Sequence, residues 1–468
     1  MTTRKIILVL FLLRFGSVMA QTDSLTEFSF QKYIDIVKLH HPISRQAELQ
    51  NAYGEANLLK AKGAFDPKLQ TEVSQKYFND KSYYNLIDGG LKIPTWFGIE
   101  LKTGYEVNDG EFLNNQNQTP NSGLLYAGIS LPIGNGLIID KRRAELKKAK
   151  IYLNSTSAQR QILLNQLILE AGIVYWEWYE SYQKLQVLEN AVSVAKDRQK
   201  AVSQSAKFGD RPSIDTLEAS IQLQNRQLNL QQAQLSYKNA SALLSIYIWA
   251  DGSIPLEVDQ NTVPSSLDVT AGIATDLSYY ALIDTQVFQH PELVLYANKL
   301  EQLEIQKKLN KEQLKPTLNL KYNPITEPIS GDPLGNYSVN NYTWGIEFSM
   351  PLLLRKERGN LNTTNLQIQD LELDFQNKQA SLIFKAKANL NAWQTAFEQV
   401  ELYQQTVEDT RRLFEGEQTL FFNGERSLFM VNAREQSYIK AQQKLIELFA
   451  KNQIAKLKTI YTFGLLAT

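Results

Sequence analysis

Cysteine is absent from the 468 residues of this chain, which excludes disulfide bonds, thiolate metal sites and thiol nucleophiles. The same absence excludes attachment to a lipid through an N-terminal cysteine. The sequence also lacks an excess of charge of either sign, because 49 basic residues balance 49 acidic ones. This balance gives no indication of a nucleic-acid-binding surface or of an acidic partner. After the N-terminal segment, no apolar run reaches the length of about 18 residues that a transmembrane helix needs.

The first residues have the pattern of a secretory signal peptide. Arg4 and Lys5 precede the apolar run 6–13, and the small residues Val18 and Ala20 stand just before a plausible cleavage point. We therefore expect the mature chain to begin near Gln21. Arg14 interrupts the apolar run, and an uncleaved anchor is the alternative. An exported chain without membrane helices would have to cross a membrane as β-strands.

The longest regular pattern runs from Asp140 to about Phe208. Its apolar residues recur at spacings of three and four, which is typical of a helix that supercoils against neighbours. At 1.5 Å per residue, such a helix is roughly 100 Å long. Gly209 and Pro212 then indicate a turn, and a second amphipathic stretch returns from Ser213 to about Trp249. The sequence therefore predicts a very long helical hairpin.

A different pattern precedes this hairpin. A short helix that begins at His41-Pro42 is expected to stop at Asp66-Pro67, because the residue before a proline disfavours helical dihedral angles. The following residues alternate apolar and polar side chains and contain many aromatics, as in β-strands. The polar stretch 108–122 is rich in Asn and predicts an exposed loop. The predicted strands are 68–78, 84–93, 98–107 and 124–132.

The same order of motifs then occurs a second time, which indicates a tandem duplication. The first two pairs of motifs are separated by 249 residues, the third by 219 and the fourth by 215. The first strand region is therefore 30 residues longer than the second, enough for one extra hairpin or for longer loops. The repeated motifs are His41-Pro42 and His290-Pro291, Asp66-Pro67 and Lys315-Pro316, Leu131-Pro132 and Met350-Pro351, and Gly209 and Gly424.

These patterns divide the chain into eight segments. The predicted segments are a signal peptide over 1–20, N-terminal and first short helices over 21–66, a first strand region over 67–133, a first long helical hairpin over 134–250, a linker over 251–276, short helices of the second repeat over 277–315, a second strand region over 316–351, and a second long helical hairpin with the C-terminus over 352–468.

The order of these motifs resembles the TolC-like outer-membrane efflux family over essentially the whole mature chain. The resemblance implies a mixed α and β membrane protein: a homotrimer whose strands form one shared transmembrane β-barrel, continued by a long periplasmic α-helical barrel. It implies the cell outer membrane of a Gram-negative bacterium, with outer-membrane lipid around the barrel. It further implies a periplasmic adaptor protein and an inner-membrane pump as partners, no cofactor and no catalytic activity.

Strand number independently favours a shared barrel. A membrane-spanning sheet must close, because unpaired edge groups in hydrocarbon cost several kcal/mol each. Single-chain barrels begin at about eight strands. The second strand region has room for two strands and the first for two to four, so one chain has too few to enclose a pore. The expected function is therefore the exit duct of a tripartite efflux or type I secretion system, and the alternative is a structural or adhesive coiled-coil envelope protein.

The resemblance also assigns roles to residues at the two turns between long helices. Adaptor proteins are expected to contact Gly209, Ser213, Gly424 and Ser427, where the hydroxyl groups are suited to cap the returning helices. Asp215 stands six positions after the first turn glycine, and Arg426 stands two positions after the second. These positions hold the closed gate in the family. Arg211 and Glu425 complete the candidate gate.

Other chemically notable residues have simpler interpretations. Two further acidic positions of the family gate are Met430 and Ala433 here, so the usual cation-binding carboxylate ring is missing or built elsewhere.

His40 and His41 are expected to begin a helix rather than to bind a metal, since no third ligand is nearby. The charged cluster 408–412 predicts a solvated helix face or part of a constriction. No catalytic set stands out. Aromatic residues expected in the two interfacial girdles of the barrel are Tyr83, Tyr84, Trp96, Phe97, Tyr105, Tyr126, Tyr337, Tyr342 and Trp344.

Overall fold

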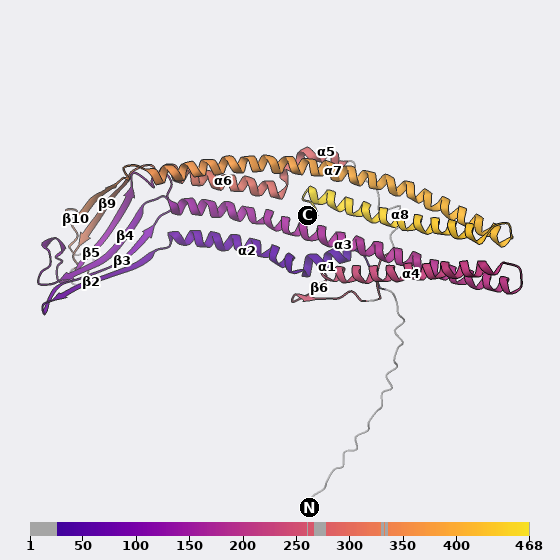
Figure 1. The fold of residues 1–468 in the computed structure, drawn as a ribbon. Coiled ribbons are helices and arrows are strands. Elements are labelled where there is room, and N and C mark those ends of the chain that lie inside the picture. The colour runs from indigo at the N-terminus through magenta and orange to yellow at the C-terminus, as the bar shows by residue number, and fades with distance from the viewer. Residues whose placement is uncertain (1–25, 260, 266–277, 329–331, 333–335, 468) are drawn as a thin grey trace, which may run out of the picture.

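The computed structural model describes residues 26–259, 261–265, 278–328, 332 and 336–467. Figure 1 shows an elongated molecule with a β-sheet at one end and long helices that extend away from it. The predicted signal peptide 1–20 and residues 266–276 of the predicted linker lie outside the described residues. Among the residues that the structure describes, no helix combines the length and the apolar character needed to cross a bilayer.

Two short helices precede the sheet in each half of the chain. In the first half these are α1 (Phe30–His40) and α2 (Pro42–Lys62), followed by the 3₁₀ turn η1 (Gly63–Phe65). In the second half they are α5 (Ser278–Gln286) and α6 (Pro291–Glu312), joined by η3 (Val287–Gln289). The prediction that His41 begins a helix is confirmed, since its Nδ1 accepts a hydrogen bond from the Ile43 N–H at 3.2 Å. The same prediction is wrong for His40, which is the last residue of α1. His290 caps α6 in the same way, through the Glu292 N–H at 3.2 Å.

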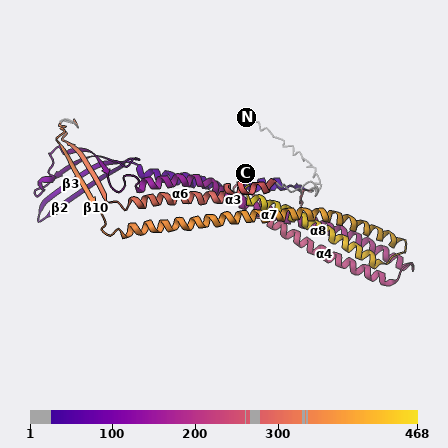
Figure 2. The same cartoon turned by 90° about the horizontal axis from the view of Figure 1, so that it is seen from above.

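The two long hairpins form most of the molecule. In the first, α3 (Lys141–Lys207) has 67 residues and α4 (Ser213–Ser245) has 33. In the second, α7 (Arg355–Phe422) has 68 residues and α8 (Leu428–Thr462) has 35. The longer helix of each pair is therefore roughly 100 Å long. Both hairpins turn through a glycine in the left-handed region, with φ of +81° at Gly209 and at Gly424. The hairpins lie side by side along the molecule (Figures 1 and 2).

One antiparallel sheet joins the strands of both halves in the order β10-β9-β5-β4-β3-β2. Figure 2 shows that this sheet is twisted and curled. The junction between the halves is the pair β5–β9, in which Ile129 lies opposite Tyr322. The strands are β2 (Lys68–Phe78), β3 (Lys81–Pro94), β4 (Glu100–Asp109), β5 (Leu124–Pro132), β9 (Thr317–Thr326) and β10 (Tyr342–Ser349).

The length difference between the halves has a structural explanation. The first half contributes four strands to the sheet and the second half contributes two. β2 follows the first helix stop and β5 precedes the first long helix, just as β9 and β10 do in the second half. The 30 additional residues therefore form the hairpin β3–β4, not longer loops. The polar loop after β4 contains only a short 3₁₀ turn, η2 (Asn115–Asn117).

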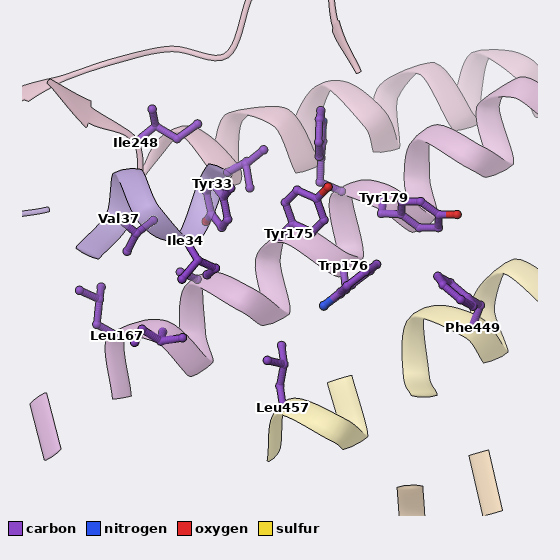
Figure 3. Packing of buried hydrophobic residues seen from close by; sticks show 14 of the residues in the cluster. Tyr33, Ile34, Val37, Leu167, Tyr175, Trp176, Tyr179, Ile248, Phe449 and Leu457 are labelled. Carbon is purple, nitrogen blue, oxygen red and sulfur yellow. The ribbon is translucent and has the colours of Figure 1, made fainter. Parts of the chain in front are cut away.

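The main hydrophobic core lies halfway along the helices, where α1, α3, α4 and α8 meet (Figure 3). Trp178 of α3 is fully buried, and its indole N–H donates to Ser241 Oγ of α4 at 3.0 Å. Tyr175 donates its hydroxyl to the Phe28 carbonyl at 2.8 Å. The N-terminal strand β1 (Thr26–Phe28) pairs in parallel with β8 (Thr262–Pro264) beside this core. A second two-stranded pair joins β6 (Trp249–Ala250) and β7 (Ile254–Pro255). This core therefore holds the helices together about halfway along the molecule, and the ends of the hairpins extend beyond it.

Candidate functional site

The sheet has one apolar face that no other part of the described chain covers. Cross-strand partners in an antiparallel sheet point to the same side. Leu69 and Trp344 are 81% and 64% exposed, although both are large apolar residues. A soluble sheet buries its apolar face, so this exposed surface indicates contact with lipid or with a partner. The exposed apolar residues on this face are Leu69, Val73, Tyr77, Ile87, Leu101, Tyr105, Ile129, Tyr322, Tyr342, Trp344, Ile346 and Phe348.

The opposite face of the sheet is polar. It carries ion pairs between neighbouring strands, such as Lys92 with Glu100 at 2.8 Å and Lys321 with Glu347 at 2.8 Å. Basic and acidic side chains on this face balance, which matches the wall of a water-filled passage without a preference for ions of one sign. The charged residues are Lys68, Lys76, Lys92, Lys102 and Lys321, and Glu72, Asp88, Glu100, Glu106 and Glu347.

Tyr126 lies flat against the polar face. Its hydroxyl donates to Asp88 Oδ1 of β3 at 2.9 Å, across the intervening strand β4. The ring covers Gly90 and Gly104, and a Cβ added at Gly90 would stand 2.7 Å from the tyrosine oxygen. Only glycine leaves room for the ring here. The tyrosine therefore narrows the polar side less than an upright aromatic side chain would.

The prediction that nine aromatic residues form interfacial girdles is wrong for two of them. Tyr126 and Tyr84 lie on the polar face, opposite Gly104 and Lys76 respectively. Tyr105, Tyr342 and Trp344 lie on the apolar face as expected. Tyr84 pairs with Lys76 in the same register that pairs Lys68 with Lys92, so regular alternation along β3 places it on the polar face.

The other aromatics lie near the ends of the strands. Trp96 and Phe97 lie in the turn after β3, at the helical end of the sheet, and are 76% and 50% exposed. Tyr83 packs against Phe112 at the opposite end, with ring centroids 4.7 Å apart. Tyr337 is exposed before β10. Exposed aromatics thus lie at both ends of the strands, where a membrane interface would place them.

The two edges of the sheet are unpaired in the protomer. β2 and β10 each have a hydrogen-bonded neighbour on one side only. Such edges pair readily with another strand. The long helices also have unpartnered apolar faces. On α4, exposed residues recur every seven positions at Ile214, Ile221, Leu228 and Leu235. The sheet edges and this helical stripe therefore both lack partners among the described residues.

The predicted adaptor contacts lie together at the end of the molecule farthest from the sheet (Figure 1). A Cβ added at Gly209 or Gly424 would have no atom within 4 Å, so only the positive φ of +81° demands glycine. The expectation that Ser213 and Ser427 cap the returning helices through their hydroxyls is wrong. Ser213 is already inside α4, and neither α4 nor α8 has a side-chain cap hydrogen bond. The exposed Phe208 and Phe422 flank the same turns.

Among the candidate gate residues, Arg211 and Asp215 contact each other, whereas Arg426 contacts Glu417. Arg211 lies 3.8 Å from the Asp215 carboxylate, and it also donates to the Phe421 carbonyl of α7 at 3.1 Å. Its guanidinium stacks 3.8 Å from the Phe421 ring centroid. Arg426 instead lies 3.5 Å from Glu417, which is buried. Arg211 therefore connects the two turns.

Asp215 and Arg426 form no ion pair with each other in the described part of this protomer. Glu425 lies in the second turn, where its N–H donates to the Leu420 carbonyl at 3.0 Å. The gate assignment thus stays a prediction.

Some charged residues near the turns were not predicted. Arg198, Arg226 and Glu435 form a buried cluster between α3, α4 and α8. Glu435 stands in the seam of α8 between the apolar residues Val431 and Ile439, each four positions away. A charged residue at such a seam position is a signal that sequence analysis alone can detect.

Comparisons with known proteins agree with this architecture. The family described as outer membrane efflux protein matches residues 282–460. No curated protein sequence matches the chain. The Campylobacter jejuni CmeC outer membrane channel aligns with a TM-score of 0.64 at 15% identity, over 93% of this chain and 85% of that one. The open-state Neisseria gonorrhoeae MtrE outer membrane channel aligns with a TM-score of 0.67 at 12% identity, over 93% and 88%. The Vibrio cholerae outer membrane protein VceC gives 0.62 at 13%, over 93% and 96%.

The chain shares the fold of these solved outer-membrane channels, with a six-stranded sheet continued by two long helical hairpins. The resemblance of the chain to the TolC-like outer-membrane efflux proteins is thereby confirmed.

Proposed function

We propose that this chain is one protomer of an outer-membrane exit duct in a Gram-negative bacterium. It passes substrates from a periplasmic adaptor and an inner-membrane pump to the exterior, in a tripartite efflux or type I secretion system. The observation that carries this proposal is the sheet, whose uncovered face is apolar and whose opposite face is polar and charged. Such a sheet fits a barrel with lipid outside and water inside. The helical hairpins continue it into the periplasm.

The proposed duct is a homotrimer. Six strands are too few to close a transmembrane barrel, whereas three copies supply about eighteen. Closure pairs the β2 edge of one protomer with the β10 edge of the next, so that no backbone group remains unpaired in lipid. The stripe Ile214, Ile221, Leu228 and Leu235 on α4 supports the same assembly, because a neighbouring helix would bury it.

Selection of substrates is assigned to the pump rather than to this chain. The polar face of the sheet has as many basic as acidic residues, so it would exclude neither cations nor anions. The chain itself supplies a passage and no catalytic step. Gly209, Ser213, Gly424 and Ser427 are proposed to contact the adaptor, and Phe208 and Phe422 give these turns exposed apolar surface for that contact.

The gate is proposed to close where the turns of three protomers meet. Asp215 and Arg426 bridge neighbouring protomers in this arrangement, while Arg211 holds the two turns of one protomer together through Phe421. Glu425 stands beside Arg426 in the same constriction. An exposed salt bridge contributes only about 0 to 1 kcal/mol, so several in the trimer act together.

The apolar face provides a direct test, because adjacent residues of β2 point to opposite sides. Val73 is 64% exposed on the apolar face, and Ser74 lies on the polar face. An arginine in the lipid near the bilayer midplane costs about 2–4 kcal/mol, but an arginine in water costs little. Val73→Arg should therefore abolish recovery of trimer from outer membranes, and Ser74→Arg should leave it nearly unchanged. Western blots of separated membranes after detergent extraction measure both.

The competing proposal is a structural or adhesive coiled-coil envelope protein, whose sheet would form a stalk in water. In that case Val73→Arg would be tolerated as well as Ser74→Arg, and the purified protein would stay soluble without detergent. A channel also conducts ions across a planar bilayer, whereas a stalk does not. Equal recovery of the two variants, together with the absence of conductance, would refute the duct.

A further inference from the structure

Positive charge is concentrated where the helices meet the sheet. Four helices reach this level, α2 and α6 with their C-terminal ends and α3 and α7 with their N-terminal ends (Figure 1). The ten residues of each helix nearest the sheet, with the loops that join them to it, contain 15 basic and 7 acidic residues. Their net charge is therefore +8, in a chain whose total is zero. We call this region the basic belt; it comprises residues 53–67, 133–150, 303–316 and 350–364.

The excess of positive charge is confined to this level. Ten residues span about 15 Å of helix. The next ten residues of the same four helices include three basic and five acidic residues, so the excess does not continue along them. At the opposite end of the sheet, the loops 79–80, 110–123 and 327–341 contain four acidic residues and no basic one. The charge of the belt thus distinguishes one end of the sheet from the other.

Helix dipoles explain only part of this distribution. Basic residues are favourable at a helix C-terminus, which applies to α2 and α6. They are unfavourable at an N-terminus, yet α3 begins with Lys141-Arg142-Arg143 and has no acidic residue in its first turn. In the same way, α7 begins with Arg355-Lys356. A partner of negative charge outside the chain would compensate for this unfavourable placement.

Most of the basic side chains in the belt are available to such a partner. Ion pairs within the chain engage five of the fifteen, which are Arg142, Arg143, Lys148, Lys307 and Lys315. The other ten are exposed and have no acidic partner within the part of the chain that the structure describes. Long basic side chains of this kind can extend their charged ends toward a nearby surface. These ten residues are Lys60, Lys62, Lys141, Lys147, Lys150, Lys308, Lys311, Arg355, Lys356 and Arg358.

The basic belt adjoins the apolar face of the sheet. In the loops at this end, Trp96, Ile138 and Leu352 are 76%, 70% and 96% exposed. In a duct whose sheet spans the outer membrane, this level is the boundary between hydrocarbon and periplasm. Negative charge at a membrane boundary comes from phospholipids with anionic headgroups, which attract clusters of Lys and Arg beside a membrane-spanning segment. Charge, exposure and position therefore indicate the same partner.

We propose that the basic belt binds anionic phospholipid headgroups of the periplasmic leaflet through their phosphate groups. This proposal rests on the proposed function of the chain, which supplies the membrane and the orientation of the duct in it. Each basic residue near an anionic membrane surface strengthens binding about fivefold. The ten exposed basic residues of one protomer become about thirty in the trimer, and they surround the duct at a single level.

The test measures which lipid stays bound to the full-length trimer. The protein is inserted into vesicles of equimolar phosphatidylglycerol and phosphatidylethanolamine and extracted in nonionic detergent, and mass spectrometry counts the lipids that it retains. Unaltered trimers should retain the anionic lipid at least about fivefold over the zwitterionic one. Reversing the charge of four lysines lowers the net charge of the belt from +8 to zero, so the ratio should approach one. This belt variant combines Lys147→Glu, Lys150→Glu, Lys308→Glu and Lys311→Glu.

The matched control reverses four exposed lysines outside the belt, which also have no acidic partner among the described residues. It changes the net charge of the chain by the same amount and should keep the preference for the anionic lipid. The control variant combines Lys196→Glu, Lys238→Glu, Lys385→Glu and Lys440→Glu.

Two further measurements cover the case that the belt variant forms no trimer. Replacing Arg355, Lys356 and Arg358 together with glutamine should lower the same ratio. About 1 M salt should also lower it for the unaltered trimer, because the Debye length falls to about 3 Å. A preference that is lost in the belt variant and kept in the control supports the proposal. Equal ratios in the two variants, or no preference in the unaltered trimer, overturn the belt but not the duct. A protein that does not insert into vesicles overturns both.

Discussion

The hairpin β3–β4 offers the sharpest test of the proposed barrel, because it is the part of the sheet that the second half of the chain lacks. Removing residues 79–108 joins β2 directly to the loop before β5, as β9 is joined to β10. β2 and β5 run antiparallel, with two strands between them, and Leu69 shares a face with Ala127 through Leu91 and Thr103. The shortened sheet therefore keeps its apolar and polar faces when β2 pairs with β5.

The size of the effect follows from the number of strands. The unaltered protomer contributes six strands, so its trimer has about eighteen, and the deletion leaves four per protomer, or about twelve. Barrel diameter grows roughly linearly with strand number. The deletion should thus reduce the diameter to about two thirds and the cross-section to about 0.44 of its original value.

Exclusion of polyethylene glycols from the external side of the channel measures this width without dependence on the periplasmic gate. The radius of the largest polymer that enters should fall to about two thirds in the deletion variant. Deleting 112–117 is the matched control, since it shortens the outer loop and removes no strand. An unchanged cut-off radius in a variant that still forms trimers would refute the reasoning. A barrel of twelve strands in the unaltered trimer, counted by electron cryo-microscopy, would do the same.

Three further predictions concern the helices. Replacing Gly209 and Gly424 together with valine, which disfavours their φ of +81°, should abolish export while trimers still reach the membrane; normal export would remove the turns from the adaptor site. Asp215→Ala with Arg426→Ala should raise single-channel conductance with little change in thermal stability, and unchanged conductance would reject this gate. Burial lowers the pKa of His290 to about 4. Between about pH 6.5 and 4, the unfolded chain therefore binds a proton that the folded chain does not. The free energy of unfolding should fall as the pH drops through this window, by about 3 kcal/mol per protomer. His290→Asn, which retains a helix cap, should flatten that dependence in thermal melts at pH 5 and 7.5; an equal dependence in both proteins would contradict the assignment.

Local rules in the sequence were sufficient for the elements themselves. The helix expected from Asp140 to Phe208 begins at Lys141 and ends at Lys207, because its seam spacing, its capping residue and the following glycine all agree. Gly209 and Gly424 both adopt the left-handed conformation that their place after a long helix suggested. The order of motifs also indicated two repeats.

The sequence was less informative about which face a side chain occupies. Around Tyr126, the run 124–127 is apolar on both faces, so alternation does not distinguish them. Along 84–87 apolar residues likewise fall on both faces, since Tyr84 and Leu86 lie on the polar face and Ile87 lies on the apolar face. The extra 30 residues were also compatible with a hairpin or with loops, because only pairing with a neighbour distinguishes an exposed strand from an extended loop.

Tertiary structure alone decided the long-range arrangement. Ile129 and Tyr322 are neighbours in the sheet although nearly two hundred residues separate them, and nothing local to either strand specifies that pairing. In the same way, the charge of Glu435 was visible in its seam, but its two arginine partners come from helices more than two hundred residues earlier in the chain. The sequence by itself determined where helices and strands form, since those depend on residues a few positions apart. The edges of the sheet, the faces of its aromatics and the charged joint between hairpins depend on contacts between distant segments, and only the folded chain brings those segments together.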